Sequence, residues 1–156
     1  MLILGGLGLS GLGNVSTARI GSTVDFSLND FSNKPIRVSD YRGHPVLVNL
    51  WASWCPPCRA EMPDLIKFFD DHQADGLVLL AVNSADDANS ARQFISDQKM
   101  PFPVLYDPKG TAERLFNTDG LPSTFLIDKA GVLRFAWTGE ISQSILNQQV
   151  APLLSQ

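Results

Sequence analysis

A short apolar run leads directly into the only two cysteines of the chain, and this junction constrains the fold more than any other feature. The run covers residues 46–51, Val-Leu-Val-Asn-Leu-Trp, and such a segment is typical of a strand covered on both faces. After Cys55 and Cys58, apolar residues at helical spacing predict a helix over residues 57–73. The sequence therefore predicts a C-x-x-C pair where a buried strand ends and a helix begins, with Cys55 presented at the surface.

The rest of the chain alternates between strand-like and helix-like patterns. Strands are expected at residues 24–28, 36–38, 46–51, 77–82, 104–106, 123–127 and 132–138. Helices are expected at residues 57–73, at residues 86–99 with Asp86 and Asp87 as caps, at residues 111–116, and from Ser142 until Pro152 ends or bends the last one. Early alternation followed by a late antiparallel hairpin predicts an α/β fold, a mixed sheet with helices on both faces.

Residues 1–18 differ from the rest of the chain. They are apolar, hold five of the 12 glycines and contain no Lys or Arg. An apolar stretch followed by Ser16-Thr17-Ala18 resembles a secretory signal cleaved after Ala18, although the basic start of such a signal is missing. A truncated signal, a disordered tail and a short membrane anchor all stay open. We expect one domain over residues 19–156 and a periplasmic or otherwise exported protein, with a cytoplasmic location less favoured.

Charge and composition exclude several classes of protein. The chain has 12 Lys+Arg against 16 Asp+Glu, a net charge of −4, and no basic run, which weighs against binding to nucleic acid or to an anionic membrane surface. No apolar run approaches the roughly 20 residues of a membrane-spanning helix. We expect a soluble body, a monomer, with a membrane tether only at its N-terminus.

The cysteine pair suits thiol-disulfide exchange. A helix N-terminus favours the thiolate of Cys55, which is the species that attacks a disulfide. Cys58, one helical turn later, can then resolve the mixed disulfide on Cys55. A zinc site would need further ligands, but there is no second cysteine pair and His44 and His72 are isolated, so no metal is expected. A purely structural disulfide would close a very short loop and constrain little of the unfolded chain.

Around these cysteines the chain resembles the thioredoxin superfamily, and more narrowly its exported TlpA, ResA and DsbE type. The resemblance covers residues 20–154. It rests on residues 25–28 (Asp-Phe-Ser-Leu), 39–43 (Ser-Asp-Tyr-Arg-Gly), 46–63 with the central Trp-Cys-Pro-Pro-Cys, 102–107 (Phe-Pro-Val-Leu-Tyr-Asp) and 120–128 (Gly-Leu-Pro-Ser-Thr-Phe-Leu-Ile-Asp). It implies a thioredoxin-like fold, a central mixed sheet flanked by helices, with an N-terminal hairpin and an extra helix and strand inserted at residues 86–103.

The resemblance also implies a substrate-binding surface. Pro122 is expected to follow a cis peptide bond and to lie against the C-x-x-C pair, while the backbone of Leu121 pairs with an extended segment of the substrate. Without the resemblance, a trans proline at the start of a strand would be the simpler interpretation. Trp54, Pro56 and Pro57 complete the expected contact surface, with Trp54 shielding the disulfide.

Two polar residues near the cysteines bear on proton transfer. Glu61 follows Cys58 by three residues and lies on the same helical face. ResA-like enzymes carry a glutamate here that takes part in proton handling, so the resemblance implies a catalytic role for Glu61, with an ordinary surface glutamate as the open alternative. Asn49 stands where thioredoxin has a buried aspartate that accepts a proton. An amide cannot titrate, so Glu61 or water would be the proton acceptor instead.

The resulting hypothesis is a thiol-disulfide oxidoreductase that reduces protein disulfides through Cys55 and Cys58, without a metal or an organic cofactor. Its partners would be disulfide-containing proteins and an upstream thiol reductant. Cytochrome c maturation, copper-site assembly and a general periplasmic thiol pool are all compatible with it. A thiol peroxidase is the alternative enzyme class, but the Pro-x-x-x-Thr-x-x-Cys pattern of peroxiredoxins is absent, because Val48 and Ala52 occupy the Pro and Thr positions. A redox-inactive binding module is the third possibility.

Overall fold

The computed structural model describes residues 17–156 of the chain. The predicted signal or anchor at residues 1–18 therefore lies, except for Thr17 and Ala18, outside the described residues. Within residues 17–156, no helix combines the length and the hydropathy needed to cross a membrane.

A five-stranded mixed sheet forms the centre of the molecule, with the strand order β5-β4-β3-β6-β7. Its strands are β5 (Val104–Asp107), β4 (Val78–Ser84), β3 (Val46–Trp51), β6 (Ser123–Ile127) and β7 (Leu133–Thr138). The pairs β3–β4 and β4–β5 are parallel, whereas β3–β6 and β6–β7 are antiparallel. The predicted mixed sheet with a late hairpin is confirmed.

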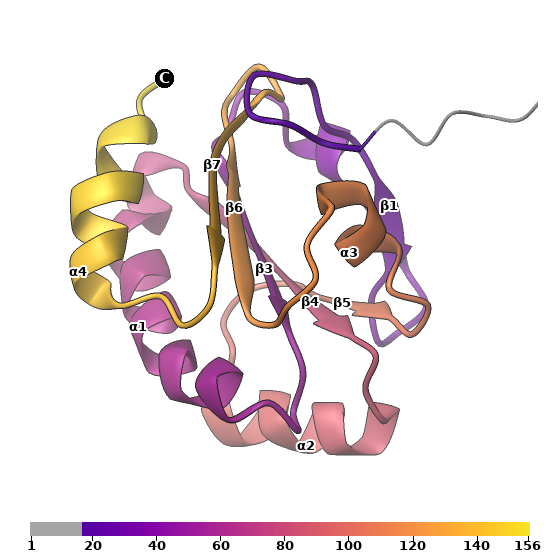
Figure 1. The fold of residues 1–156 in the computed structure, drawn as a ribbon. Coiled ribbons are helices and arrows are strands. Elements are labelled where there is room, and N and C mark those ends of the chain that lie inside the picture. The colour runs from indigo at the N-terminus through magenta and orange to yellow at the C-terminus, as the bar shows by residue number, and fades with distance from the viewer. Residues whose placement is uncertain (1–16) are drawn as a thin grey trace, which may run out of the picture.

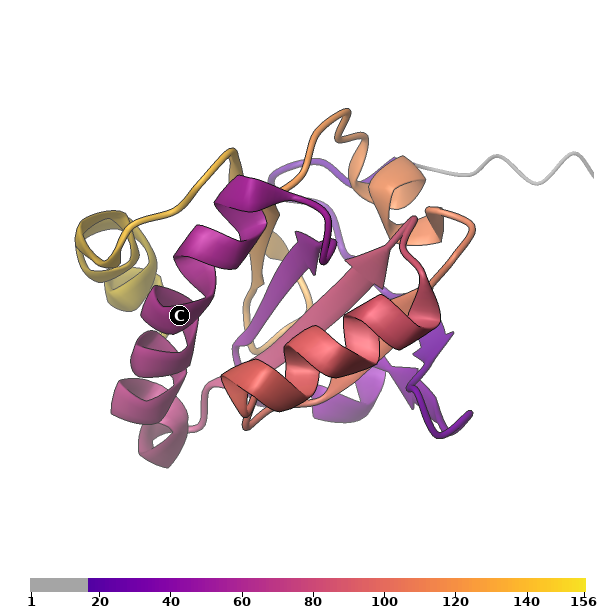
Figure 2. The same cartoon turned by 90° about the horizontal axis from the view of Figure 1, so that it is seen from below.

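Helices cover both faces of this sheet (Figure 1). They are α1 (Pro56–His72), α2 (Ala88–Gln98), α3 (Thr111–Phe116) and α4 (Gln143–Ile145), the last continued by a π-helical turn (Leu146–Val150) and a 3-10 turn (Ala151–Leu153). Short 3-10 helices also occur at Val38–Tyr41 and Gln73–Asp75. Figure 2 shows α1 and α2 lying on the same side of the sheet. Pro152 lies in the final 3-10 turn, as expected of a residue that ends or bends the helix.

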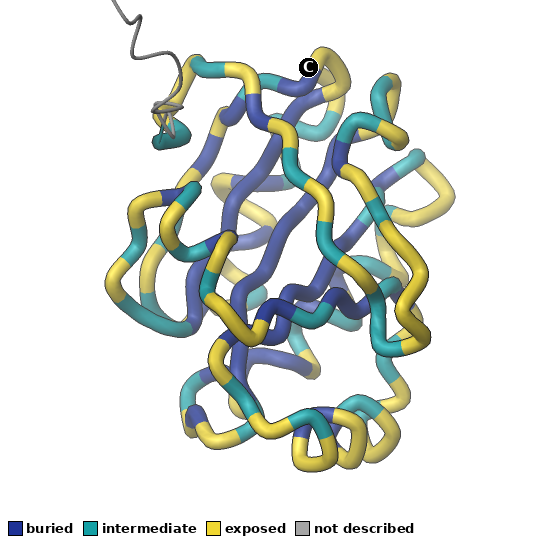
Figure 3. Tube along the Cα trace, turned by 90° about the vertical axis from the view of Figure 1, so that its right-hand side faces the viewer, coloured by how far each residue is buried: buried dark blue, intermediate teal, exposed yellow. Residues whose placement is uncertain are grey.

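The side chains of β3 divide between two hydrophobic cores because successive residues of a strand point to opposite faces. Leu47 and Trp51 belong to the cluster under α1, α2 and α4, which also contains both cysteines. Val48 and Leu50 belong to the cluster on the other face, with α3. All six residues of β3 are buried, and Figure 3 shows the strands as the buried centre of the molecule. A fully buried leucine contributes about 2 kcal/mol of stability, so the strand that leads to the cysteines is firmly held.

The N-terminal hairpin is present, but its first strand begins later than expected. It consists of β1 (Ser27–Asn29) and β2 (Pro35–Arg37), paired antiparallel. Val24, expected in the first strand, instead donates its N–H to the carbonyl of Gly131 at 2.9 Å. Its apolar side chain is buried in the hydrophobic cluster on the α3 face of the sheet.

Candidate redox site

Cys55 and Cys58 form a disulfide at the N-terminus of α1. Cys55 is the N-cap residue, and its Sγ accepts a hydrogen bond from the backbone N–H of Cys58 at 3.3 Å. Pro56 and Pro57 occupy the first helical positions, where a missing backbone N–H leaves no bond unmade. The helix N-terminus and the Cys58 N–H both favour negative charge on the sulfur of Cys55.

The expectation that Cys55 is presented at the surface is wrong. Cys55 is 3% exposed and Cys58 is fully buried. Both belong to the hydrophobic cluster under α1, and Leu121 packs against that cluster. The exposed neighbours are Trp54, with 61% of its surface accessible, and Pro56.

Glu61 is fully buried, so the interpretation as a surface glutamate is wrong. Its two oxygens accept hydrogen bonds from the side-chain Nδ2 of Asn49 and from the backbone N–H of Ile141, each at 2.8 Å. Burial raises the pKa of Glu61 to about 7, against the lowering effect of these two hydrogen bonds. A carboxyl group that titrates near neutral pH, one helical turn after Cys58, can accept and return protons under physiological conditions.

Asn49 connects Glu61 to the sheet. Its Nδ2 also donates to Oγ1 of Thr124 at 3.2 Å, and the two residues are directly opposite in the β3–β6 register. Its Oδ1 has no hydrogen-bond partner among residues 17–156. Rotating the amide would offer this oxygen as an acceptor, so Asn49 can face either the ionised or the protonated form of Glu61.

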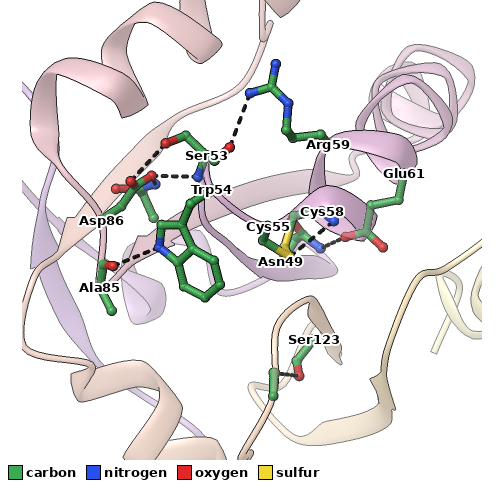
Figure 4. The surroundings of a disulfide bond; sticks show 12 residues. Asn49, Ser53, Trp54, Cys55, Cys58, Arg59, Glu61, Ala85, Asp86 and Ser123 are labelled. Carbon is green, nitrogen blue, oxygen red and sulfur yellow. Dashed lines mark hydrogen bonds between the residues drawn. A yellow bond between two sulfur atoms is a disulfide. The ribbon is translucent and has the colours of Figure 1, made fainter.

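The Leu121–Pro122 peptide bond is cis, as the resemblance implied. The antiparallel register pairs Leu50 with Ser123, so Pro122 comes one residue further along, opposite the end of β3. Ser123 anchors this turn by donating its hydroxyl to the carbonyl of Gly120 at 2.7 Å. In Figure 4 the Ser123 segment lies across from the disulfide.

Hydrogen bonds also fix the segment just before Cys55, through Asp86 and Ala85, which the sequence did not predict to be part of the site. Asp86 accepts bonds from the backbone N–H and the hydroxyl of Ser53 at 2.6 and 2.8 Å. The indole N–H of Trp54 donates to the carbonyl of Ala85 at 3.0 Å. The sequence suggested Asp86 as a helix cap, but only Asp87 caps α2. Nothing in the local sequence signals a contact across the 33 residues that separate Ser53 from Asp86.

Arg59, the nearest cation in the sequence, is engaged away from the sulfur atoms. Its guanidinium donates to the carbonyl of Ser53 at 3.2 Å and lies 4.4 Å from the ring centre of Phe94. Backbone N–H groups at the N-terminus of α1, rather than the Arg59 side chain, therefore favour a Cys55 thiolate.

The part of the chain that the structure describes contains no group of three or more His, Cys, Asp or Glu side chains placed to hold a metal ion. His44 lies near the carbonyl of Gly76, and His72 near Asp75. The expected absence of a metal and an organic cofactor stays a prediction.

Comparison with known proteins identifies a matching family and several relatives. A family model described as AhpC/TSA matches residues 20–136. The chain is 32% identical to the thiol-disulfide oxidoreductase ResA of Geobacillus thermodenitrificans, over 96% of this chain and 89% of that protein. It is 34% identical to the thiol:disulfide interchange protein DsbE of Pseudomonas aeruginosa, over 76% of this chain and 64% of that protein.

A solved structure extends the similarity to three dimensions. A Chlorobium tepidum protein assigned as a DsbE thiol:disulfide interchange protein superposes with a TM-score of 0.81 and 32% sequence identity. The match covers 88% of this chain and 99% of that one. The architecture described above is therefore a thioredoxin-like fold.

Proposed function

This chain belongs to the AhpC/TSA family and is a thiol-disulfide oxidoreductase, and we propose that it reduces disulfide bonds of protein substrates with Cys55 as the attacking sulfur. The observation that carries the proposal is the disulfide at the start of α1, where Cys55 is the N-cap and accepts the Cys58 N–H.

The two cysteines divide the reaction. In the reduced protein, the Cys55 thiolate attacks one sulfur of a substrate disulfide, and the other substrate sulfur leaves as a thiolate. Cys58, deprotonated, then attacks Sγ of Cys55, which releases the second substrate sulfur and forms the Cys55–Cys58 disulfide. Two electrons pass to the substrate, whose sulfurs take up two protons. The complete burial of Cys58 supports its role as the resolving cysteine.

Glu61 serves as the base for Cys58 in this scheme. Its buried carboxyl, with a pKa of about 7, lies three residues after Cys58 on the same helix. The carboxyl takes the proton of the Cys58 thiol as the mixed disulfide is resolved, and it returns the proton to solvent or substrate thiolate afterwards. Asn49 can hydrogen-bond to Glu61 in both protonation states, because its amide can present Nδ2 to the ionised carboxylate or Oδ1 to the protonated form.

The substrate surface surrounds the buried disulfide. Trp54, Pro56 and Pro57 supply exposed or half-exposed apolar contacts on the helix side. Leu121 and the buried Pro122 directly precede β6, and Leu121 packs against the cluster that holds both cysteines. In this proposal the backbone of Leu121 pairs with an extended segment of the substrate. Such a surface fits a polypeptide better than a small thiol.

The physiological setting follows from the same proposal. We assign the chain to the periplasm or an equivalent exported location, with residues 1–18 as an export signal or anchor and residues 19–156 as one redox domain. It acts as a monomer without a metal or an organic cofactor. An upstream thiol reductant restores the dithiol after each cycle, and the maturation of c-type cytochromes is a process that needs such a reductant.

Trapping tests the roles of the cysteines. A Cys58→Ser variant should accumulate mixed disulfides with substrate proteins, because nothing resolves the bond at Cys55. Cys55→Ser is the matched control and should trap none. Equal trapping by both variants would overturn the assignment, and a wild-type protein that fails to reduce the disulfides of insulin would overturn the proposed activity on proteins.

A further inference from the structure

We propose that Asp86 is a positioning residue of the redox site, which fixes Ser53 and Trp54 so that the exposed indole meets the substrate chain. The inference rests on the proposed reduction of protein disulfides and adds to it a determinant of substrate binding. Asp86 lies just beyond β4, far in sequence from the cysteines, and the proposed reaction does not use it.

The Asp86 carboxylate accepts four hydrogen bonds. Oδ2 accepts from the backbone N–H of Ser53 at 2.6 Å and from Nδ2 of Asn83 at 2.8 Å. Oδ1 accepts from the Ser53 hydroxyl and from the backbone N–H of Asp87, both at 2.8 Å. Asn83 is fully buried at the end of β4, so the carboxylate ties the active-site loop to the sheet (Figure 4).

A second contact, one residue away, fixes the indole. Trp54 donates its Nε1–H to the carbonyl of Ala85, and Ala85 has a φ of 48°, a left-handed conformation that is uncommon for a residue with a side chain. The N–H of Ala85 donates to the carbonyl of Asp107 at 3.3 Å, which holds this turn. Two consecutive residues, Ala85 and Asp86, thus hold two consecutive residues immediately before Cys55.

The bonds leave Ser53 with no free polar group. Its N–H and hydroxyl are bound by Asp86, and its carbonyl accepts from Arg59 at 3.2 Å. Trp54, in contrast, keeps 61% of its surface exposed. A residue held this firmly beside a large exposed apolar ring indicates that the orientation of the ring matters.

The indole also borders an open cavity of about 580 Å³ beside the redox site. Ser53, Trp54 and Arg59 line it from one side, and α2 residues that include Asn89 and Gln93 line it from the other. Amide and guanidinium groups and the carboxylate of Asp97 lie around the apolar ring, and such a lining suits the backbone and side chains of a peptide. We assign this cavity to the substrate segment that continues past the attacked disulfide.

Only a carboxylate satisfies all four donors at position 86. Each oxygen of Asp86 faces a backbone N–H, that of Ser53 or that of Asp87. An asparagine in either orientation would turn its NH₂ group toward one of these N–H groups, and that contact would be lost. Asp86→Asn therefore breaks the contact with almost no change of shape.

The test compares Asp86→Asn with Asp87→Asn, which removes the same charge one residue away and keeps a good helix cap. For the wild type and both variants, KM and kcat are measured with insulin, and the rate is measured with oxidised glutathione as a small disulfide. Asp86→Asn should raise KM for insulin about fivefold, with kcat and the glutathione rate changed less than about twofold. Asp87→Asn should match the wild type.

Fluorescence reports on the contact without any substrate. The difference between each protein and its Trp54→Phe derivative isolates the Trp54 signal, whose anisotropy should fall in Asp86→Asn and not in Asp87→Asn. Because this measurement needs no turnover, it still decides the role of Asp86 if the wild type fails to reduce insulin and the proposed function is lost. An unchanged Trp54 anisotropy would overturn the inference.

A double variant separates positioning from general structural damage. In the Trp54→Phe background, Asp86→Asn should raise KM for insulin no further, since both changes act through the indole. If Asp86→Asn does not fold, Ser53→Ala removes the hydroxyl contact alone and should raise KM about twofold in the same direction. A slowing of insulin and glutathione by the same factor, or additive effects in the double variant, would overturn the role of Asp86.

Discussion

Two buried carboxyl groups in this protein have pKa values shifted in opposite directions. Glu61, beneath the redox site, is fully buried, and Asp128, in the turn between β6 and β7, is 3% exposed. Burial raises the pKa of both. In Asp128, bonds from the N–H groups of Val132 and Ala130 and from Arg134 outweigh burial, so its pKa lies below the usual range. In Glu61, the bonds from Ile141 and Asn49 do not outweigh it, and the pKa is about 7.

Both depth and partners make the difference, because more protein surrounds Glu61 than Asp128 and its burial effect is not outweighed. Asp128 has a cation, the guanidinium of Arg134 at 2.6 Å, while the donors to Glu61 are an amide and a backbone N–H. The largest lowering effect on the pKa of Asp128 comes from the N–H of Val132, and the hydrogen bond and charge of Arg134 add to it. The turn therefore holds a permanent anion that serves structure, whereas the redox site holds a group that changes charge near neutral pH and serves proton transfer.

Removing the carboxylate from the turn should have the largest effect on stability. Asp128→Ala leaves the N–H groups of Ala130 and Val132 without their acceptor and Arg134 without its partner. We expect a loss of about 3 kcal/mol in the free energy of unfolding at pH 7. Urea denaturation measures it, and the reduction potential of the disulfide should not change. An equally stable variant would show that the Asp128 contacts contribute nothing net.

Glu61→Gln should alter how stability depends on pH. The pKa of Glu61 is 4.5 unfolded and about 7 folded, so its contribution is fully present below pH 4.5 and is lost as the pH rises through about 7. The free energy of unfolding of the oxidised wild type should therefore fall by about 2 kcal/mol between pH 5 and pH 8 through Glu61. The variant should lack that loss, because glutamine does not titrate.

Glutamine fits the site, so the wild type and Glu61→Gln should differ in titration rather than in packing. Its oxygen can accept the Ile141 N–H, and its NH₂ group can donate to Oδ1 of Asn49 after the amide rotates. Urea unfolding of both proteins at a series of pH values gives the answer. Parallel curves for wild type and variant would contradict the raised pKa.

Arg134→Met tests whether the cation accounts for the contrast. The Arg134 side chain is 42% exposed, so solvent screens the pair, and the loss should be about 1 kcal/mol or less at pH 7. The pKa of Asp128 should rise toward its ordinary value of 3.8. Because a lowered pKa stabilises the fold above the unfolded value and the benefit is lost on acidification, acid unfolding of the variant should begin at higher pH. Acid unfolding at an unchanged pH would assign the low pKa to the turn N–H groups instead.

The sequence predicted the parts of this protein that depend on neighbouring residues. The apolar pattern of residues 46–51 and the helical spacing after Cys58 located β3 and α1, and with them the redox pair. The cis peptide before Pro122 followed from resemblance to a family, because sequence alone only makes a cis bond permissible.

Contacts between distant segments explain what the sequence did not predict. Glu61 is fully buried, and its carboxyl group accepts a hydrogen bond from the backbone N–H of Ile141, 80 residues later. In the same way, Val24 was expected in a hairpin strand but is held by Gly131. A glutamate on an amphipathic helix carries no local signal that a later loop will close over it, so only the folded chain separates it from a surface residue.

The smallest expected effect concerns the charge that adjoins Glu61. The carboxylate of Glu140, just before Ile141, raises the pKa of Glu61 by repulsion, an effect smaller than that of burial. Glu140→Gln should therefore lower the pKa of Glu61 by a few tenths of a unit, and the shift should shrink in high salt because Glu140 is exposed. NMR titration of the Glu61 carboxyl carbon measures it. Glu113→Gln on α3, on the opposite face of the sheet, removes the same charge and should leave the pKa unchanged. Equal shifts in both variants would mean that the net charge of the protein, and not the neighbouring carboxylate, tunes the pKa of Glu61.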